Sequence, residues 1–133
     1  MLKVEHIGIA VQSLAQAVPL YEKLLQTACY KTEAVASEAV ETAFFKVGDT
    51  KIELLQSTAP DGVIQKFIDR RGEGMHHIAF EVADIEAEMQ RLQSEGFALL
   101  SDVPKRGADN KPICFLSPKS AAGVLIELCQ EAT

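Results

Sequence analysis

The 133-residue sequence lacks features that mark several large classes of protein. Tryptophan is absent, and the three cysteines (Cys29, Cys114 and Cys129) cannot all pair within one chain, which argues against a secreted disulfide framework. Basic residues are also scarce, because 13 Lys and Arg face 19 Asp and Glu and give a net charge of −6. We therefore expect no general binding to nucleic acid.

Long apolar runs and targeting signals are missing as well. No run approaches the roughly 20 apolar residues of a membrane-spanning helix. The first six residues, Met-Leu-Lys-Val-Glu-His, lack the basic and then apolar build of a signal peptide. The sequence also contains neither a Walker A motif nor a GxGxxG motif for phosphate binding. These absences predict a soluble, cytoplasmic protein that does not associate with membranes.

An internal repeat divides the chain. Residues 4–11 read VEHIGIAV and residues 75–82 read MHHIAFEV, while residues 52–56 read IELLQ and residues 126–130 read IELCQ. Two pairs of similar segments in the same order predict the duplication of one module, because a solenoid needs more and shorter repeats. We expect a single domain over residues 1–133, with one module at about 1–58, a connector at about 59–73 and a second module at about 74–133.

Hydrophobic periodicity predicts the order βαβββ in each half, and hence an α+β protein. Both helices have a capping residue before their first apolar position, Ser13 in the first half and Asp84 in the second. Residues 102–111, with Pro104, Gly107 and Asn110, are typical of a loop. The expected strands are 2–11, 28–36, 40–47 and 50–56, then 75–82, about 97–101, 112–116 and 123–130, and a short helix is expected at 62–71.

Each half has one histidine on its opening strand and one glutamate on its closing strand. These are His6 and Glu53 in the first half, and His77 and Glu127 in the second. Two imidazoles and two carboxylates suit a divalent first-row metal ion with open coordination positions. Taken singly, each residue is more often a surface or structural group, but their joint recurrence favours a four-ligand metal site.

Other residues carry weaker signals. His76 faces away from His77 on a strand and is expected to be structural, and Cys129 shares a face with Glu127 but is by default a small buried hydrophobe. Glu41 lies in a strand-like run and by itself indicates only a surface position. Four basic residues within 99–120 either attract an anionic substrate or are merely solvated, and these are Lys105, Arg106, Lys111 and Lys119.

Several motifs resemble the vicinal oxygen chelate superfamily, which includes glyoxalase I, extradiol dioxygenases and antibiotic-binding resistance proteins. Within it, the sequence is most similar to the methylmalonyl-CoA epimerase family, and the resemblance covers essentially the whole chain. Its most specific part is Ser117-Pro118-Lys119-Ser120 followed by 123–128, GVLIEL. The other motifs are HIGIA at 6–10, GMHHIAF at 74–80 and PKRGA at 104–108.

This resemblance implies an incomplete barrel-like mixed sheet around a metal cleft. It implies metal ligation by His6, Glu53, His77 and Glu127, with cobalt as the first choice of ion and nickel, manganese or zinc as alternatives. Some epimerases have glutamine at the second position, whereas Glu53 matches bacterial glyoxalase I. The family also has a carboxylate base on the strand where Glu41 lies, which implies a catalytic role for that residue.

The activity implied is epimerisation of methylmalonyl-CoA, by removal of the proton alpha to the thioester through a metal-stabilised enolate. Glu41 and Glu127 would move the proton on the two faces of that carbon. The CoA portion of the substrate would lie near Lys105, Lys111 or Lys119, and a homodimer is expected. Two alternatives remain open: an isomerase like glyoxalase I, and a metal-free protein of the same fold that binds a small molecule.

Overall fold

The computed structural model describes residues 1–131 and divides the chain into two compact units. One unit comprises residues 6–76, and the other comprises residues 1–5 together with 77–133. The boundary between the units falls within the first strand and again within the fifth. Among the residues described, no helix is long and apolar enough to cross a membrane.

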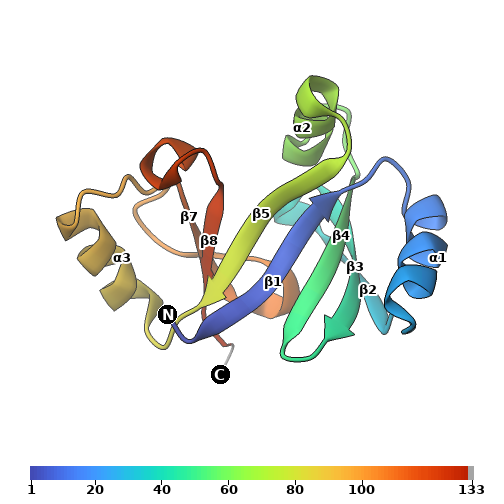
Figure 1. Cartoon of the computed structure of the whole chain (residues 1–133). Coiled ribbons are helices and arrows are strands. Elements are labelled where there is room, and N and C mark those ends of the chain that lie inside the picture. Colours follow the sequence, from blue (N-terminus) through green and yellow to red (C-terminus); the bar gives the residue numbers. More distant parts are fainter. Residues whose placement is uncertain (132–133) are drawn as a thin grey trace. The chain divides into compact units, whose positions relative to one another are not determined.

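The unit of residues 6–76 has a four-stranded mixed sheet in the order β2-β3-β4-β1 (Figure 1). Strand β1 runs parallel to β4, and β3 runs antiparallel to both of its neighbours, β2 and β4. The elements are β1 (Lys3–Ala10, of which 6–10 belong here), α1 (Leu14–Leu25), β2 (Lys31–Val35), a 3₁₀ turn (Ala36–Glu38), β3 (Val40–Val47), β4 (Thr50–Ser57) and α2 (Val63–Arg71).

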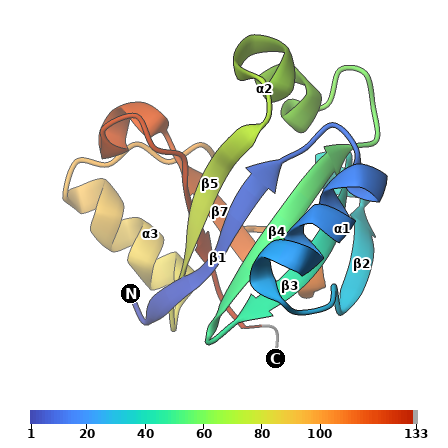
Figure 2. The ribbon, with the colours of Figure 1, turned by 45° about the vertical axis from the view of Figure 1, so that its right-hand side comes forward.

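Helix α1 covers one face of this sheet. It begins after Ser13, whose side chain accepts a hydrogen bond from the backbone N–H of Gln16, as the expected capping box requires. Its buried face packs against β3 and β4, where Figure 2 shows the helix in front of the strands. The apolar cluster between them comprises Val11, Leu14, Ala17, Ala43, Phe45 and Leu54.

The second unit repeats this plan with the strand order β5-β8-β7-β6. Strand β8 runs parallel to β5 and antiparallel to β7, and α3 packs on an apolar cluster with β7 and β8. The backbone N–H of Leu2 donates to the carbonyl of Glu81, which adds the N-terminal residues to this unit. Its elements are β5 (Gly74–Glu81, from His77 on), α3 (Ile85–Ser94), β6 (Lys105–Arg106), two 3₁₀ turns (Ala108–Asn110 and Pro118–Ala121), β7 (Pro112–Leu116) and β8 (Ile126–Cys129).

One expected strand is wrong. Residues 97–101 form only an isolated bridge, between Leu99 and Leu116, and the second strand of this module is instead the two-residue β6 inside the expected loop. Leu100 donates to the carbonyl of Phe115, and Ser117 donates to that of Ala98. Pairing stops there, because the segment turns away at residues 101–104, which include a proline that cannot donate to a ladder.

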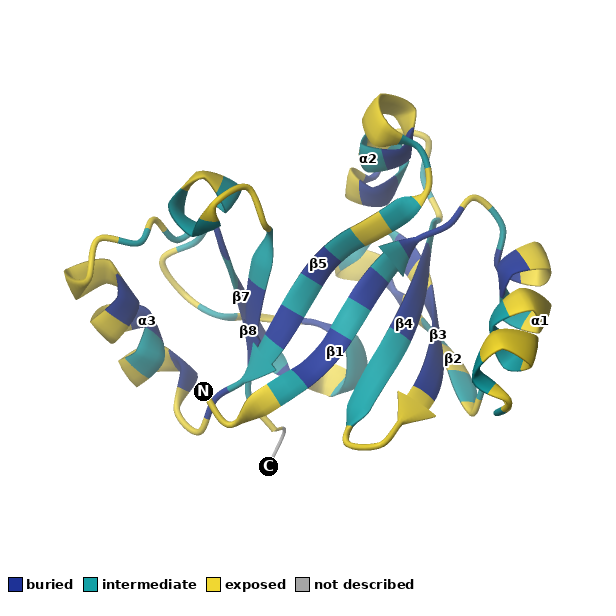
Figure 3. Ribbon diagram, viewed as in Figure 1, coloured by how far each residue is buried: buried dark blue, intermediate teal, exposed yellow. Residues whose placement is uncertain are grey.

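Burial alternates over much of β1 and β5, as expected when opposite faces of a sheet have different surroundings (Figure 3). On β1 and β5 the buried positions include His6 and His77, and on β4 and β8 they include Glu53 and Glu127. The sheet face turned toward the helix is apolar in both units. The charged side chains therefore lie on the other face.

A glutamine at the end of the closing strand holds the first turn of the helix in each unit. The side-chain oxygen of Gln56 accepts from the N–H of Leu14 at 2.7 Å, and that of Gln130 accepts from the N–H of Ile85 at 2.8 Å. The first N–H groups of a helix have no partner within the helix, so these bonds satisfy donors that would otherwise be left unpaired. The two glutamines are the last letters of the repeated IELLQ and IELCQ segments.

We predict that Gln56→Leu and Gln130→Leu each lower the free energy of unfolding by about 1–2 kcal/mol, because each leaves a half-buried N–H without its acceptor. Urea denaturation followed by circular dichroism measures this change. Gln93→Leu, at an exposed position of α3, is the matched control and should change stability by less than about 0.5 kcal/mol. Equal stability of all three variants would contradict a stabilising role for these two bonds.

Candidate metal and proton-transfer site

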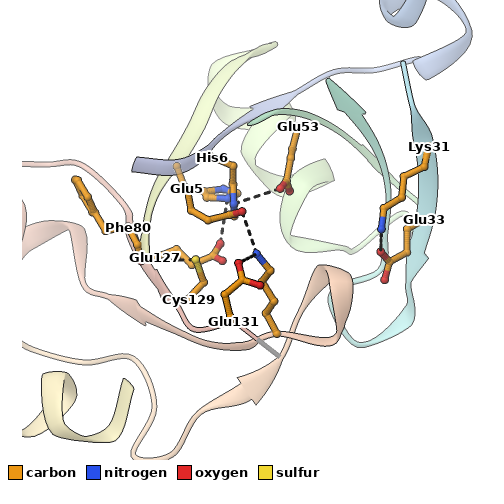
Figure 4. A network of polar contacts seen from close by, with 11 residues as sticks. Glu5, His6, Lys31, Glu33, Glu53, Phe80, Glu127, Cys129 and Glu131 are labelled. Carbon is orange, nitrogen blue, oxygen red and sulfur yellow. Dashed lines mark hydrogen bonds and ion pairs between the residues drawn. The ribbon is translucent and has the colours of Figure 1, made fainter. Parts of the chain in front are cut away.

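In the unit of residues 6–76, His6 and Glu53 form a buried pair. Nδ1 of His6 lies 3.2 Å from Oε2 of Glu53, and both side chains are less than a tenth exposed (Figure 4). The parallel register places Gly8 opposite Glu53. Because Gly8 has no side chain, the face is open at that point, and His6, two residues earlier on the same face, reaches the carboxylate.

The second unit contains the equivalent pair, His77 and Glu127. Nε2 of His77 lies 3.1 Å from Oε1 of Glu127, and both side chains are again buried. The residue opposite Glu127 is Ala79, whose side chain is a single methyl group. Gly8, which has no side chain, lies at the equivalent place in the other unit. The same arrangement therefore arises twice from the same strand register.

An aromatic ring and a lysine complete each constellation. Phe44 of β3 is the cross-strand partner of Glu53, and the ammonium of Lys31 lies 4.7 Å from the centre of that ring. In the other unit Phe115 is the partner of Glu127, and Lys105 lies 5.6 Å from its ring centre.

Of these four residues, the sequence singled out Lys105 alone, as a candidate for binding an anionic substrate. The two phenylalanines are 71 positions apart, the same offset as the two histidines, and that offset is the signal that could have found them.

The surroundings of Glu127 are apolar. Ala79, Ile113 and Cys129 form a small buried cluster on the same face of the sheet. Burial above all, and then the charges of Glu5 and Glu127, raise the pKa of the Cys129 thiol. The thiol therefore stays protonated at neutral pH and is neither an anionic metal ligand nor a nucleophile, which agrees with its expected role as a small hydrophobe.

Glu41 lies on a different face from Glu53. In the register of β3 and β4, Phe44 opposes Glu53, whereas Glu41 opposes Gln56 on the face that α1 covers. The side chain of Glu41 is exposed at the end of the strand. Strand alternation therefore separates the side chains of Glu41 and Glu53, and the catalytic role of Glu41 stays a prediction. Thr42, the residue after Glu41 on β3, lies on the same face as Glu53 and is 1% exposed.

The basic residues expected near a CoA tail are in different environments. Lys105 and Arg106 are exposed and line a groove of about 570 Å³, whose other wall includes residues 83–86 at the start of α3. Lys119 is exposed on the 3₁₀ turn before β8. Lys111, by contrast, is buried and paired with Glu5 and Glu131, so it is not available to a substrate phosphate.

Comparison with known proteins gives the family. Residues 5–115 match the Glyoxalase/Bleomycin resistance protein/Dioxygenase superfamily. The chain belongs to this superfamily. The α+β class and the glyoxalase-like fold expected from the repeat are thereby confirmed.

Three relatives describe where in the superfamily the chain lies. It is 38% identical to the uncharacterized protein YqjC of Bacillus subtilis, covering 98% of this chain and 93% of that protein. It is 36% identical to the ethylmalonyl-CoA/methylmalonyl-CoA epimerase of Cereibacter sphaeroides, covering 96% and 97%. A structure of a Streptomyces coelicolor methylmalonyl-CoA epimerase variant, in complex with 2-nitronate-propionyl-CoA, has a TM-score of 0.96 and 34% identity, covering 100% and 96%.

The buried histidines and glutamates of this superfamily member could bind a metal ion. An imidazole and a carboxylate in each unit are ligand types of divalent first-row ions, and a metal would offset the cost of burying the carboxylates. The pairs lack the thiolates of closed structural zinc sites. A protonated histidine beside each glutamate would also balance the charge, so the donor set fits a metal without requiring one.

We predict that cobalt, nickel, manganese or zinc raises the melting temperature of the metal-free protein, because an ion that binds only the folded state stabilises it. At 100 times the dissociation constant the gain is about 2.7 kcal/mol. His6→Ala and His77→Ala should each abolish the rise in differential scanning calorimetry. His76→Ala is the control and should keep the rise, since His76 packs edge-on against Phe67.

Absence of both a thermal shift and stoichiometric metal in elemental analysis of the wild-type protein would contradict the metal site. The His–Glu contacts would then be ion pairs, as in a metal-free binding protein of this fold.

Proposed function

We propose that this protein is a metal-dependent methylmalonyl-CoA epimerase, which interconverts the two configurations at the carbon between the thioester and the carboxylate. The observation that carries the proposal is the repeated buried His–Glu pair in a chain that is similar over nearly its full length to acyl-CoA epimerases. A proton on a carbon between two carbonyl groups is acidic enough for a carboxylate to remove once the resulting charge is stabilised.

We further propose that His6, Glu53, His77 and Glu127 bind one divalent ion, with cobalt as the first candidate. Such an ion would supply a Lewis acid for the negative charge that develops on the substrate's carbonyl oxygens. This ligand set is inferred from the donor chemistry of each pair and from the family. The histidines orient the carboxylates, since each imidazole nitrogen lies within 3.2 Å of its glutamate.

Epimerisation needs one group to take the proton from one face of the carbon and another to return a proton to the opposite face. Glu127 is our first candidate, because it is buried, lies in apolar surroundings and contacts His77. A carboxylate has two oxygens, so it can bind an ion with one and carry a proton with the other. Glu53 is a poor candidate for the second group, because the resemblance places glutamine at this position in some epimerases and an amide cannot take up a proton. We therefore propose Glu41, on the strand where the resemblance places a base.

We predict that the metal-loaded protein incorporates deuterium from heavy water at the alpha carbon of both epimers of methylmalonyl-CoA, as followed by NMR or mass spectrometry. Glu127→Gln should lower exchange from one epimer at least about 100-fold, and Glu41→Gln should do so from the other. Glu95→Gln, at the exposed C-terminal end of α3, is the control and should keep both rates. Metal content is measured for every variant, so that a lost ion is not mistaken for a lost base.

Unchanged exchange of both epimers in Glu41→Gln would contradict its role as the second base. If the wild-type protein exchanged neither epimer but isomerised the hemithioacetal of glutathione and methylglyoxal, the activity would be that of glyoxalase I.

We propose that the CoA phosphates lie near the exposed basic residues of the second unit, Lys105 and Lys119. Reversing one exposed charge should raise the KM for the acyl-CoA about two- to fivefold and leave kcat nearly unchanged, since surface charge pairs contribute little each. Lys119→Glu is the variant and Lys66→Glu, on the exposed face of α2, is the matched control. Steady-state kinetics at low and high salt measure the effect, and an unchanged KM in Lys119→Glu would contradict this placement.

A homodimer stays a prediction.

A further inference from the structure

Lys111 is a buried cation without a role in the reaction as proposed. It follows the 3₁₀ turn 108–110 and directly precedes β7, and it is 7% exposed. Its ammonium donates to Oε2 of Glu5 at 3.0 Å and to Oε1 of Glu131 at 3.1 Å. Glu5 is 3% exposed, whereas the side chain of Glu131 is largely in solvent.

Such an arrangement is costly. Removing an ammonium and a carboxylate from water costs several kcal/mol for each ion, and their attraction often does no more than offset this. A buried ion pair is therefore weak evidence for a gain in stability. Two apolar residues of similar size would hold this part of the unit at least as firmly, which points to a role in placing particular groups.

The partners of Lys111 suggest which groups those are. Glu5 is the last residue of its segment in this unit, and the next residue along the chain is His6. Glu131 follows Glu127 by four positions, at the end of the segment that begins with β8. A backbone hydrogen bond from the N–H of Gln130 to the carbonyl of Pro112 also joins the segment of Lys111 to that of Glu131. One ammonium thus ties together the residue before His6 and the strand of Glu127.

The thiol of Cys129 lies close enough to Glu5, Glu127 and Lys111 for their charges to affect its pKa. Its pKa is raised by burial and by the charges of Glu5 and Glu127, while the charge of Lys111 acts in the opposite direction. The ammonium, the two carboxylates and the thiol therefore influence one another within this unit.

We propose that Lys111 is a positioning residue, whose ammonium clamps Glu5 and Glu131 and so holds His6 and Glu127 where they bind the ion and move the proton. The inference rests on the proposed function for its catalytic part, while its metal-binding part can be measured separately. Residues that orient metal ligands without binding the ion typically affect metal affinity or activity about 10- to 100-fold.

The test uses the double variant Glu5→Gln/Lys111→Met, which removes both buried charges and keeps the side-chain volumes. Lys111→Met alone leaves the buried Glu5 without its cation and should lower the melting temperature sharply, and the double variant should regain most of that loss. Lys111→Arg keeps a cation that can bind two carboxylates and should retain most of the function. Lys66→Met, on the exposed face of α2, is the control for the substitution itself.

The double variant should bind cobalt at least about tenfold more weakly in calorimetric titration, although it is folded. In the exchange assay its kcat should fall about tenfold while KM changes by less than about twofold, because the clamp does not touch the acyl-CoA. The visible absorption spectrum of bound cobalt should also change, since it reports ligand geometry.

Wild-type cobalt affinity, spectrum and kcat in a folded double variant would overturn the proposal and leave Lys111 a purely structural residue. Absence of exchange by the wild-type protein would overturn the epimerase function instead. The cobalt titration and spectrum of the double variant would still decide the role of Lys111 in that case.

Discussion

The structure of each unit depends on one constraint, the burial of a carboxylate against an imidazole on the face of the sheet that the helix does not cover. A buried carboxylate without a partner is expensive, so the strand opposite must leave room for a histidine to reach it. Gly8 and Ala79 provide that room. The apolar cluster under α1 or α3 then occupies the other face, which the alternation of side chains keeps separate from the charges.

The repeat carries most of what could be predicted from sequence. Similar segments at two places predicted the order of elements and the pairing of each histidine with a glutamate, because strand register follows from local pattern and duplication. The short β6 and the single bridge at Leu99 could not be predicted, since a two-residue strand has no periodicity. Lys111 was expected to be solvated or to lie near an anionic substrate, because its pairing with Glu5, 106 positions away, leaves no local signal.

Strand alternation adds to what the family pattern says about Glu41. Its role was taken from the strand on which the family has a base, but one position along a strand changes the face of the sheet. Ala43 and Phe45 pack under α1, and Glu41, two residues before Ala43 on the same strand, lies on the same face. The alternation of the apolar residues alone would have placed Glu41 on the helix side, away from Glu53.

Duplication gives the two units the same set of buried and neighbouring side chains. Each unit contains a histidine, a glutamate, a phenylalanine and a lysine in the same register. Gln56 and Gln130 then tie the end of each closing strand to the helix, three residues beyond Glu53 and Glu127. Because the helix packs on that strand, the bond limits movement of the strand along its own axis, which is the movement that would carry the carboxylate away from its histidine.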